Sequence, residues 1–358
     1  MSTSEREGSE ASEGVPLDSE RTASWSTSAE PADDDWPADS GSGPTGGDPA
    51  APVWRRLALG RAMPERAAHR RLDGPWLDDA WQRGRILLLD ERGRVVVEGP
   101  AEAPRMVWFA SDDPSASVAD ADRLFLAEED GIPYFALLAA LPEKLPDGQR
   151  TVSLREVGAE LVPFESSLLT AAIGLANWHR DYRYGPRTGT RLGWRAGGWE
   201  AEAVDGSEIV YPRTNPAIIV LVHDGVAGDE GRCLLTRGLT WPEGRYSCVA
   251  GFVEPGEAAE AAVFREVAEE TGVRISEVRY LASQAWPLPA SLMLGFYALA
   301  ESDQPVTVEE AELADACWFS RGQLRGRGPG PAPIVPPPLS IAHELLTAWR
   351  DERIENPF

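Results

Sequence analysis

Residues 251–273 read GFVEPGEAAEAAVFREVAEETGV, and they constrain this chain more than any other segment. A turn at Pro255-Gly256 leads into a predicted helix. Glu266 and Glu270 are four positions apart, so they share one face of that helix, with Glu269 beside them. Like charges at this spacing repel, and a divalent cation between them would relieve the repulsion. Hard oxygen ligands of this kind suit Mg²⁺ or Mn²⁺, and a solvated acidic helix face is the simpler alternative.

The surrounding sequence predicts a loop–helix–loop platform resting on a sheet. Apolar runs at residues 217–222, 233–235 and 246–250 are typical of strands. Val263 and Val267 give the helix an apolar stripe with which to pack on that sheet.

Three more residues are placed to hold the platform together. Glu257 lies where an acidic side chain favours a helix N-terminus. Arg265 can pair with Glu269 one turn later and keep the carboxylates in shape. Gly272 is well placed to end the helix.

The spacing of these residues resembles the Nudix box, the motif of hydrolases that cleave a nucleoside diphosphate linked to another group. The resemblance implies a Nudix fold, an α/β (α+β) architecture in which helices sandwich a mixed sheet. It also implies Mg²⁺ or Mn²⁺ as the cofactor, with Glu270 or Glu269 as the general base. The implied metal ligands are the backbone carbonyl of Ala250 and the carboxylates of Glu266, Glu269, Glu270 and Glu312.

A second motif, SQAWPLPASLMLGF at residues 283–296, resembles the signature of NADH pyrophosphatases within that superfamily. Pro287 and Pro289 are expected to stiffen a loop that presents Trp286, while Gln284 and Ser291 offer hydrogen-bonding groups. A Pro-rich turn with a buried tryptophan is the alternative. The family usually has proline where this chain has Ala285, which removes stiffness but no polar contact. The resemblance implies adenine stacking on Tyr211 and Phe252, and the full set of implied substrate-binding residues is Tyr211, Phe252, Gln284, Ala285, Trp286, Pro287, Leu288, Pro289, Ala290, Ser291 and Ala342.

The resemblance extends from about residue 52 to the C-terminus. It includes Glu312–Phe319, Pro336–Ala342 and several amino-terminal segments: Phe125-Leu126, Gly131, Tyr134–Leu137, Leu154-Arg155, Leu168–Ala171 and Ala176–His179. It predicts an amino-terminal Nudix-like α/β domain (52–165), a connecting segment (166–213) that contains a degenerate zinc ribbon, a catalytic Nudix domain (214–335) and a C-terminal helix (336–358). The composition of residues 1–51 predicts a disordered acidic tail.

Many members of the family carry a zinc ribbon of two CxxC pairs between the two domains, and this chain departs from that pattern. Gly185 and Thr188 stand in the place of the first cysteine pair, and Ala203 and Gly206 in the place of the second. The three cysteines, Cys233, Cys248 and Cys317, are spaced for neither a ribbon nor a disulfide framework. We therefore predict a vestigial, zinc-free ribbon held by packing of Trp194, Trp199 and Tyr211, with a different metal on Thr188 and His179 as the alternative.

Composition fits a cytoplasmic enzyme with an added tail. Twelve acidic residues against Arg6 and Arg21 give residues 1–50 a net charge of −10, out of −24 for the chain. That segment has few aliphatic residues and is predicted to be disordered. Neither a signal peptide nor a membrane-spanning stretch is found in the sequence. The acidic balance argues against tight, sequence-independent binding to nucleic acid.

Taken with the resemblance, these features predict a homodimeric, metal-dependent NAD(H) pyrophosphatase. Its products would be AMP and nicotinamide mononucleotide, and the same chemistry would remove NAD caps from RNA. One alternative is a broader Nudix hydrolase of ADP-ribose or dinucleoside polyphosphates, which the second motif disfavours. The other is a non-catalytic nucleotide-sensing module, which the complete set of box glutamates disfavours.

Overall fold

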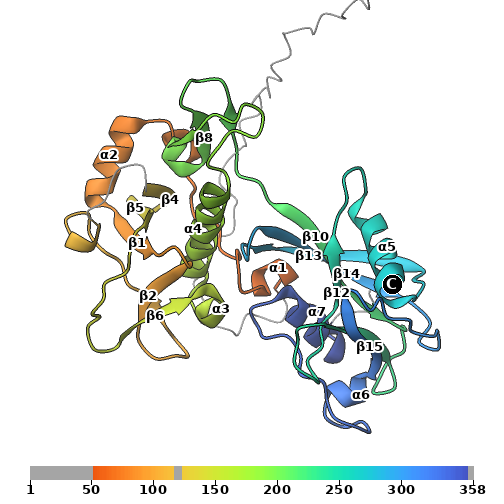
Figure 1. Ribbon diagram of the computed structural model, residues 1–358. Helices are drawn as coiled ribbons and strands as arrows, with labels where there is room; N and C mark the ends of the chain where they lie inside the picture. Colours follow the sequence, from red (N-terminus) through yellow and green to blue (C-terminus); the bar gives the residue numbers. More distant parts are fainter. Residues whose placement is uncertain (1–50, 117–122, 354–358) are drawn as a thin grey trace, which may run out of the picture. The chain divides into compact units, whose positions relative to one another are not determined.

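A computed structural model describes residues 51–116 and 123–353 of the chain (Figure 1). The predicted disordered tail therefore lies, except for Ala51, outside the described residues. Within the described ranges, no helix is long and apolar enough to span a membrane.

The amino-terminal half contains two small sheets. In one, β5 (Ile132–Leu138) lies between β1 (Arg85–Leu89), which runs parallel to it, and β4 (Arg123–Glu129), which is antiparallel. In the other, β2 (Arg94–Glu98) lies between β3 (Arg105–Met106) and β6 (Gln149–Ser153), both antiparallel to it. The helices and 3₁₀ turns of this half are η1 (Ala68–Arg70), α2 (Gly74–Arg83), η2 (Pro114–Ala116), α3 (Leu154–Val157) and α4 (Pro163–Asp181).

Helix α4 belongs to the core of this amino-terminal half. Its apolar residues Leu168, Leu169 and Ile173 are buried in one cluster with side chains of β1, β2 and β4. The predicted end of the amino-terminal domain, residue 165, lies inside this helix. That boundary does not coincide with the packing, because apolar positions one turn apart carry α4 onto the sheets as a single element.

The connecting segment forms a three-stranded antiparallel sheet. It consists of β7 (Leu192–Arg195), β8 (Glu200–Ala203) and β9 (Ile209–Val210), with η4 (Ala196–Gly198) between the first two strands. Its small core joins Leu192, Ala201 and Val210 to Trp178 at the end of α4.

The carboxy-terminal half is built on one mixed sheet, with the order β13-β14-β10-β11-β15 and with β12 also paired to β10. Its strands are β10 (Asn215–His223), β11 (Arg232–Gly238), β12 (Val249–Phe252), β13 (Glu277–Trp286), β14 (Ser291–Leu299) and β15 (Leu313–Ser320). Strands β10 and β14 run parallel, whereas the other pairs are antiparallel. The first two predicted strands are confirmed. The third begins later than predicted, at Val249 instead of residue 246, because Ser247 only bridges to Thr236 before the chain turns onto β10.

The alternating directions of the β10 side chains explain why helices cover both faces of the sheet. Ile218, Val220 and Val222 point into a core with α5 (Ala259–Thr271), whereas Ile219 and Leu221 point into a core with α7 (Ile341–Arg350). Successive strand residues face opposite sides, so a continuous apolar run buries both faces. The two helices consequently cover opposite faces of the sheet (Figure 1), as the α/β prediction required. A short helix, α6 (Arg321–Leu324), follows β15.

The chain's first described helix does not pack with the segment that follows it. Val53 of α1 (Val53–Arg56) and the adjoining Leu57 pack into the α7 core of the carboxy-terminal half. Arg56 also lies 2.7 Å from a carboxylate oxygen of Glu344 on α7. The predicted start of the amino-terminal domain at residue 52 is therefore too early, since residues 53–57 complete the other core.

Candidate active site

Glu266, Glu269 and Glu270 lie on helix α5, and Glu257 lies in the loop before it. Val263 and Val267 are buried against the sheet, as the predicted stripe requires. The helix ends at Gly272, which adopts the left-handed conformation with φ of 70° and lets the chain turn away. It begins at Ala259, so Glu257 lies in the loop just before the N-terminus of the helix.

Glycine is required at position 251 because a carboxylate lies against it. A Cβ atom at this position would come within 1.9 Å of the carboxylate carbon of Glu266. No side chain fits there while Glu266 stays where it is. The loop strand and the helix thus approach each other only because residue 251 has no side chain.

Arg265 joins the parts of the site into one unit. Its guanidinium donates two hydrogen bonds of 2.9 Å to the two carboxylate oxygens of Glu257. It also donates to Glu266 at 2.9 Å, to the backbone carbonyl of Phe252 at 2.9 Å and to Glu269 at 3.1 Å. The predicted pairing with Glu269 is confirmed, but it is one of four. The hydrogen bonds from Arg265 lower the pKa of Glu257 to about 2, so this carboxylate stays charged.

Glu270 is the site's most perturbed acid. It is buried, and no side chain or backbone N–H in the described ranges donates a hydrogen bond to its carboxylate. Burial, together with the negative charges of Glu266 and Glu312, raises its pKa to about 8. Burial likewise raises the pKa of Glu266, although its hydrogen bond from Arg265 opposes the shift. Glu269, by contrast, is exposed.

These carboxylates fit a divalent cation by their chemistry. A buried acid whose charge is opposed by two neighbouring acids is stabilised by any positive charge brought beside it. The donors are oxygens, which hard cations prefer. Within residues 51–116 and 123–353, however, no three acidic, histidine or cysteine side chains are gathered closely enough to hold an ion. One carboxylate oxygen of Glu266 accepts a hydrogen bond from Arg265.

The other predicted ligands lie at the edges of this cluster. Glu312 is exposed just before β15, close enough to shift the pKa of both buried glutamates. Ala250 lies on β12, directly before the glycine that contacts Glu266. Their roles as ligands remain predictions.

Phe252 and Tyr211 are the two aromatic residues predicted to stack on adenine. Each is 58% exposed, so neither belongs to the core. An exposed aromatic ring next to a charged cluster is suited to stacking on a base, which stabilises binding by roughly 1–3 kcal/mol.

The chain's two halves each match a known domain family. The NUDIX domain matches residues 214–337, and the NADH pyrophosphatase-like rudimentary NUDIX domain matches residues 83–178. The NAD-capped RNA hydrolase NudC of Mycobacterium tuberculosis (strain H37Rv) is 34% identical over 304 residues, which cover 81% of this chain and 94% of that protein. The chain belongs to the Nudix superfamily, in the family of NudC.

Two further similarities were found. The human NAD-capped RNA hydrolase NUDT12 is 38% identical over 196 residues, covering 52% of this chain and 42% of that protein. A solved NUDIX hydrolase from Nitrosomonas europaea is 21% identical, covers 48% of this chain and 92% of its own, and aligns with a TM-score of 0.36. The Nudix assignment confirms the resemblance drawn from residues 251–273 and 283–296. Nudix hydrolases generally use divalent metal ions.

In this Nudix protein, the second motif is a β-hairpin. Gln284 and Trp286 end β13, Ser291 begins β14, and only residues 287–290 form the loop. Gln284 is 1% exposed; its amide donates to the carbonyl of Leu339 at 3.0 Å and accepts from the N–H of Ile341 at 2.8 Å. The suggested role of Gln284 as a hydrogen-bonding group for substrate needs correction, because both of its polar atoms position the start of α7.

The hairpin loop is held by the amino-terminal half. Trp286 and Leu288 pack against the core that contains α4. Asn177 of α4 donates to the carbonyls of Pro287 at 2.9 Å and Pro289 at 2.8 Å. The remaining predicted substrate residues are divided: Ala285 and Pro289 are exposed, Ser291 and Ala290 are half-buried, and Ala342 is buried in the α7 core.

A buried carboxylate lies in the segment that corresponds to the family's zinc ribbon. Glu208 accepts hydrogen bonds from the backbone N–H of Thr188 at 3.3 Å and from its hydroxyl at 3.1 Å. A Cβ atom on Gly185 would lie 2.3 Å from Glu208. Glu208 thus lies against both residues that replace the first cysteine pair. Burial raises the pKa of Glu208, but hydrogen bonds from Thr188 and Arg187 outweigh it and hold the pKa below its usual value.

The predicted packing of this segment is correct only in part. Trp194 stacks on His179 with ring centroids 3.7 Å apart, and Trp199 donates to the carbonyl of Phe125 at 2.7 Å. Tyr211 is exposed and contributes little to the packing. His179 interacts with the carbonyl of Gly198, whereas Thr188 contacts Glu208, so the structure does not bring these two residues together as a metal pair. Sequence reasoning missed Glu208 because nothing in its neighbourhood marks a lone glutamate as buried.

Proposed function

We propose that this protein hydrolyses the pyrophosphate bond of NAD(H), giving AMP and nicotinamide mononucleotide, and removes NAD caps from the 5′ ends of RNA. The observation that carries the proposal is the pair of buried glutamates, Glu266 and Glu270, on a complete Nudix helix. Support for the substrate comes from NudC and NUDT12, both named NAD-capped RNA hydrolases.

The residues proposed to hold Mg²⁺ or Mn²⁺ are Glu266, Glu269, Glu270, Glu312 and the carbonyl of Ala250. The bound cation would neutralise charge on the pyrophosphate and lower the pKa of a bound water. Since Glu208 occupies the ribbon and no cysteine lies there, we propose that zinc has no part in the fold or the reaction.

This chain's own residues supply orientation and proton transfer. Arg265 fixes Glu257, Glu266 and Glu269 relative to the backbone of β12, so the carboxylates need little reorganisation when substrate binds. Glu270 and Glu269 remain the two candidates for the general base. The structure favours Glu270, because its carboxylate is buried and accepts no hydrogen bond from the described residues, which leaves it available to take a proton from water. Phe252 and Tyr211 are proposed to stack on the adenine.

The proposed activity is tested by comparing turnover of NADH, NAD, ADP-ribose and NAD-capped RNA in the presence of Mg²⁺, of Mn²⁺ and of a chelator. The proposal expects metal-dependent release of AMP from NAD(H) and of 5′-monophosphate RNA from capped RNA. Preference for ADP-ribose would instead indicate the broader hydrolase. Tight nucleotide binding without turnover under any condition would indicate a sensing module. Light scattering in the same preparation checks the proposed homodimer, and fractionation of cells checks the proposed cytoplasmic location.

A further inference from the structure

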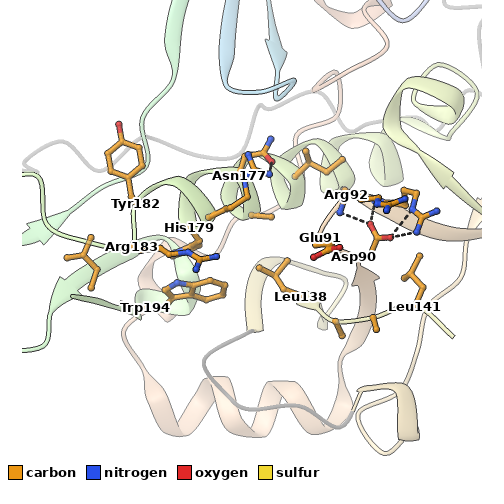
Figure 2. A pocket seen from close by; sticks show the side chains of 18 of the residues that line it. Asp90, Glu91, Arg92, Leu138, Leu141, Asn177, His179, Tyr182, Arg183 and Trp194 are labelled. Atoms are coloured by element: carbon orange, nitrogen blue, oxygen red, sulfur yellow. Dashed lines mark hydrogen bonds and ion pairs between the residues drawn. The ribbon is translucent and has the colours of Figure 1, made fainter. Parts of the chain in front are cut away.

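A large cavity lies outside the Nudix helix and its loop. It has a volume of about 1330 Å³ and is lined by the turn between β1 and β2, the end of β5, the last turns of α4 and the β7–β8 segment (Figure 2). Small-ligand pockets typically measure about 300–1,000 Å³, so this cavity has room for more than one nucleotide. None of the proposed catalytic glutamates lines it.

The cavity is basic although the chain is strongly acidic. Five arginines line it against three carboxylates, in a chain whose net charge is −24. One of the carboxylates, Asp90, is engaged by Arg94 at 2.7 Å and accepts from the backbone N–H groups of Arg92 and Arg94. The charge of Asp90 is therefore neutralised locally, and positive charge predominates on the remaining lining.

Two of the lining arginines are available to a ligand. Arg183 and Arg191 are exposed, and neither guanidinium forms an ion pair or hydrogen bond with another residue in the part of the chain that the structure describes. Arg180, in contrast, is engaged by Asp181 at 3.0 Å and by Asn177 at 2.8 Å. An arginine without a protein partner is suited to a phosphate, which it contacts through its planar set of donors.

Aromatic surfaces lie beside these arginines. Tyr184 is 62% exposed on the cavity, and Trp194 also lines it with one face held against His179. Burial lowers the pKa of His179 to about 4, so the imidazole under Trp194 is neutral at physiological pH. Exposed aromatic rings among basic groups are typical of single-stranded nucleic-acid sites, where each base stacks without regard to sequence.

One residue connects the cavity to the hairpin of the catalytic half. Asn177 lines the cavity, and its side-chain amide donates to the carbonyls of Pro287 and Pro289 at the tip of the β13–β14 loop. Its own carbonyl oxygen accepts from Arg180. The cavity wall and this loop are therefore in direct contact. A chain leaving the catalytic half along the loop would meet the basic lining.

We propose that this cavity binds the single-stranded RNA that follows the NAD cap, with Arg183 and Arg191 on its phosphates and Tyr184 and Trp194 against its bases. The inference rests on the proposed function for the identity of the ligand. It assigns the RNA body to the amino-terminal half and the connecting segment, whereas the pyrophosphate is cleaved at the Nudix helix.

The test uses the double variant Arg183→Ala/Arg191→Ala in the full chain. Fluorescence anisotropy with a short single-stranded RNA carrying a 5′-hydroxyl measures binding alone, in chelator. We expect affinity to fall by roughly 10- to 100-fold, and the salt dependence of log K to become shallower by about 1.4, from two lost phosphate contacts at about 0.7 each. Arg232→Ala, an exposed arginine on β11 that does not line the cavity, is the control and is expected to bind as wild type.

Kinetics then separate the two proposals. KM for NAD-capped RNA is expected to rise in the double variant with little change in kcat, while turnover of free NADH stays at the wild-type level. Arg183→Lys/Arg191→Lys is expected to recover most of the RNA affinity, since charge is retained. Unchanged RNA binding in the alanine variant, or an equal loss toward NADH and capped RNA, would overturn the assignment. If wild-type protein cleaves neither substrate, the proposed function fails, while the anisotropy result still decides whether the cavity binds RNA.

Discussion

Replacing Glu270 with glutamine is expected to stabilise the metal-free protein at neutral and alkaline pH while abolishing hydrolysis. The native state holds the Glu270 proton more tightly than the unfolded chain does, because the pKa rises from 4.5 to about 8 on folding. Between these values unfolding releases a proton, so native stability falls as the pH rises. Glutamine is neutral at every pH and lacks this penalty.

The size of the stability penalty follows from the pKa shift of Glu270. Each pKa unit corresponds to about 1.4 kcal/mol, so the penalty grows by about 3.5 kcal/mol between pH 5 and pH 8. Well below pH 4.5 it vanishes, since the carboxyl is protonated in both states. Titrating groups that do not interact with Glu270, such as the buried His179, affect wild type and variant alike and cancel in the difference.

Urea unfolding in chelator at several pH values measures this difference directly. Glu269→Gln is the matched control, because Glu269 is one residue away but exposed; its effect should stay within about 0.5–1 kcal/mol at every pH. Saturating Mg²⁺ should then stabilise the wild type, by about 2.7 kcal/mol at a hundredfold excess over Kd, and the Glu270→Gln variant less. A stability difference that stays flat from pH 5 to pH 8 would refute the reasoning, since it would mean that Glu270 does not titrate abnormally.

Three shorter predictions concern residues around the site. Gly251→Ala should cut kcat by 10²-fold or more with an unchanged far-ultraviolet circular dichroism spectrum, because its Cβ displaces the Glu266 carboxylate; near-normal turnover would contradict the contact. Glu208→Ala should lower the melting temperature, since the Thr188 hydroxyl and N–H lose their acceptor, and added zinc should not restore it; one tightly bound zinc per wild-type chain in elemental analysis would disprove the zinc-free ribbon. Gln284→Ala should lower stability by about 1–3 kcal/mol through its two lost hydrogen bonds and leave KM for NADH nearly unchanged, whereas a raised KM at normal stability would return Gln284 to the substrate site.

The Nudix helix could be predicted from sequence because its information is local. The spacing of Val263 and Val267 fixes the buried face, Gly272 fixes the end, and the four-residue spacing of Glu266 and Glu270 fixes their common side. The depth of burial of those glutamates could not be predicted, because it depends on β12 and on the loop before β15. The pKa of Glu270 is therefore a property of the tertiary structure.

For the hairpin motif, the family resemblance predicted the position of the element but not the role of each residue in it. The resemblance located residues 283–296 correctly as a distinct element, but it gave Gln284 a ligand-facing role. In a strand, neighbouring side chains point to opposite faces, so register decides which residue meets a ligand and which meets the core. The packing of Val53 and Leu57 into the α7 core could not be predicted either, because the sequence of a four-residue helix does not indicate which core it packs against.

The proposed substrate, capped RNA, would meet negative charge at the Nudix helix and positive charge in the cavity. The net charge of −24 argues against tight, sequence-independent binding to nucleic acid over the whole surface. At physiological ionic strength, however, exposed charges are screened over about 8 Å, so a phosphate senses only the groups near it. The buried glutamates of the Nudix helix would repel a pyrophosphate unless a cation is bound between them. The cavity, by contrast, contains two arginines, Arg183 and Arg191, that have no protein partner in the described chain. Capped RNA would therefore gain its electrostatic attraction from Arg183 and Arg191, and the catalytic glutamates would be left to act on the cap.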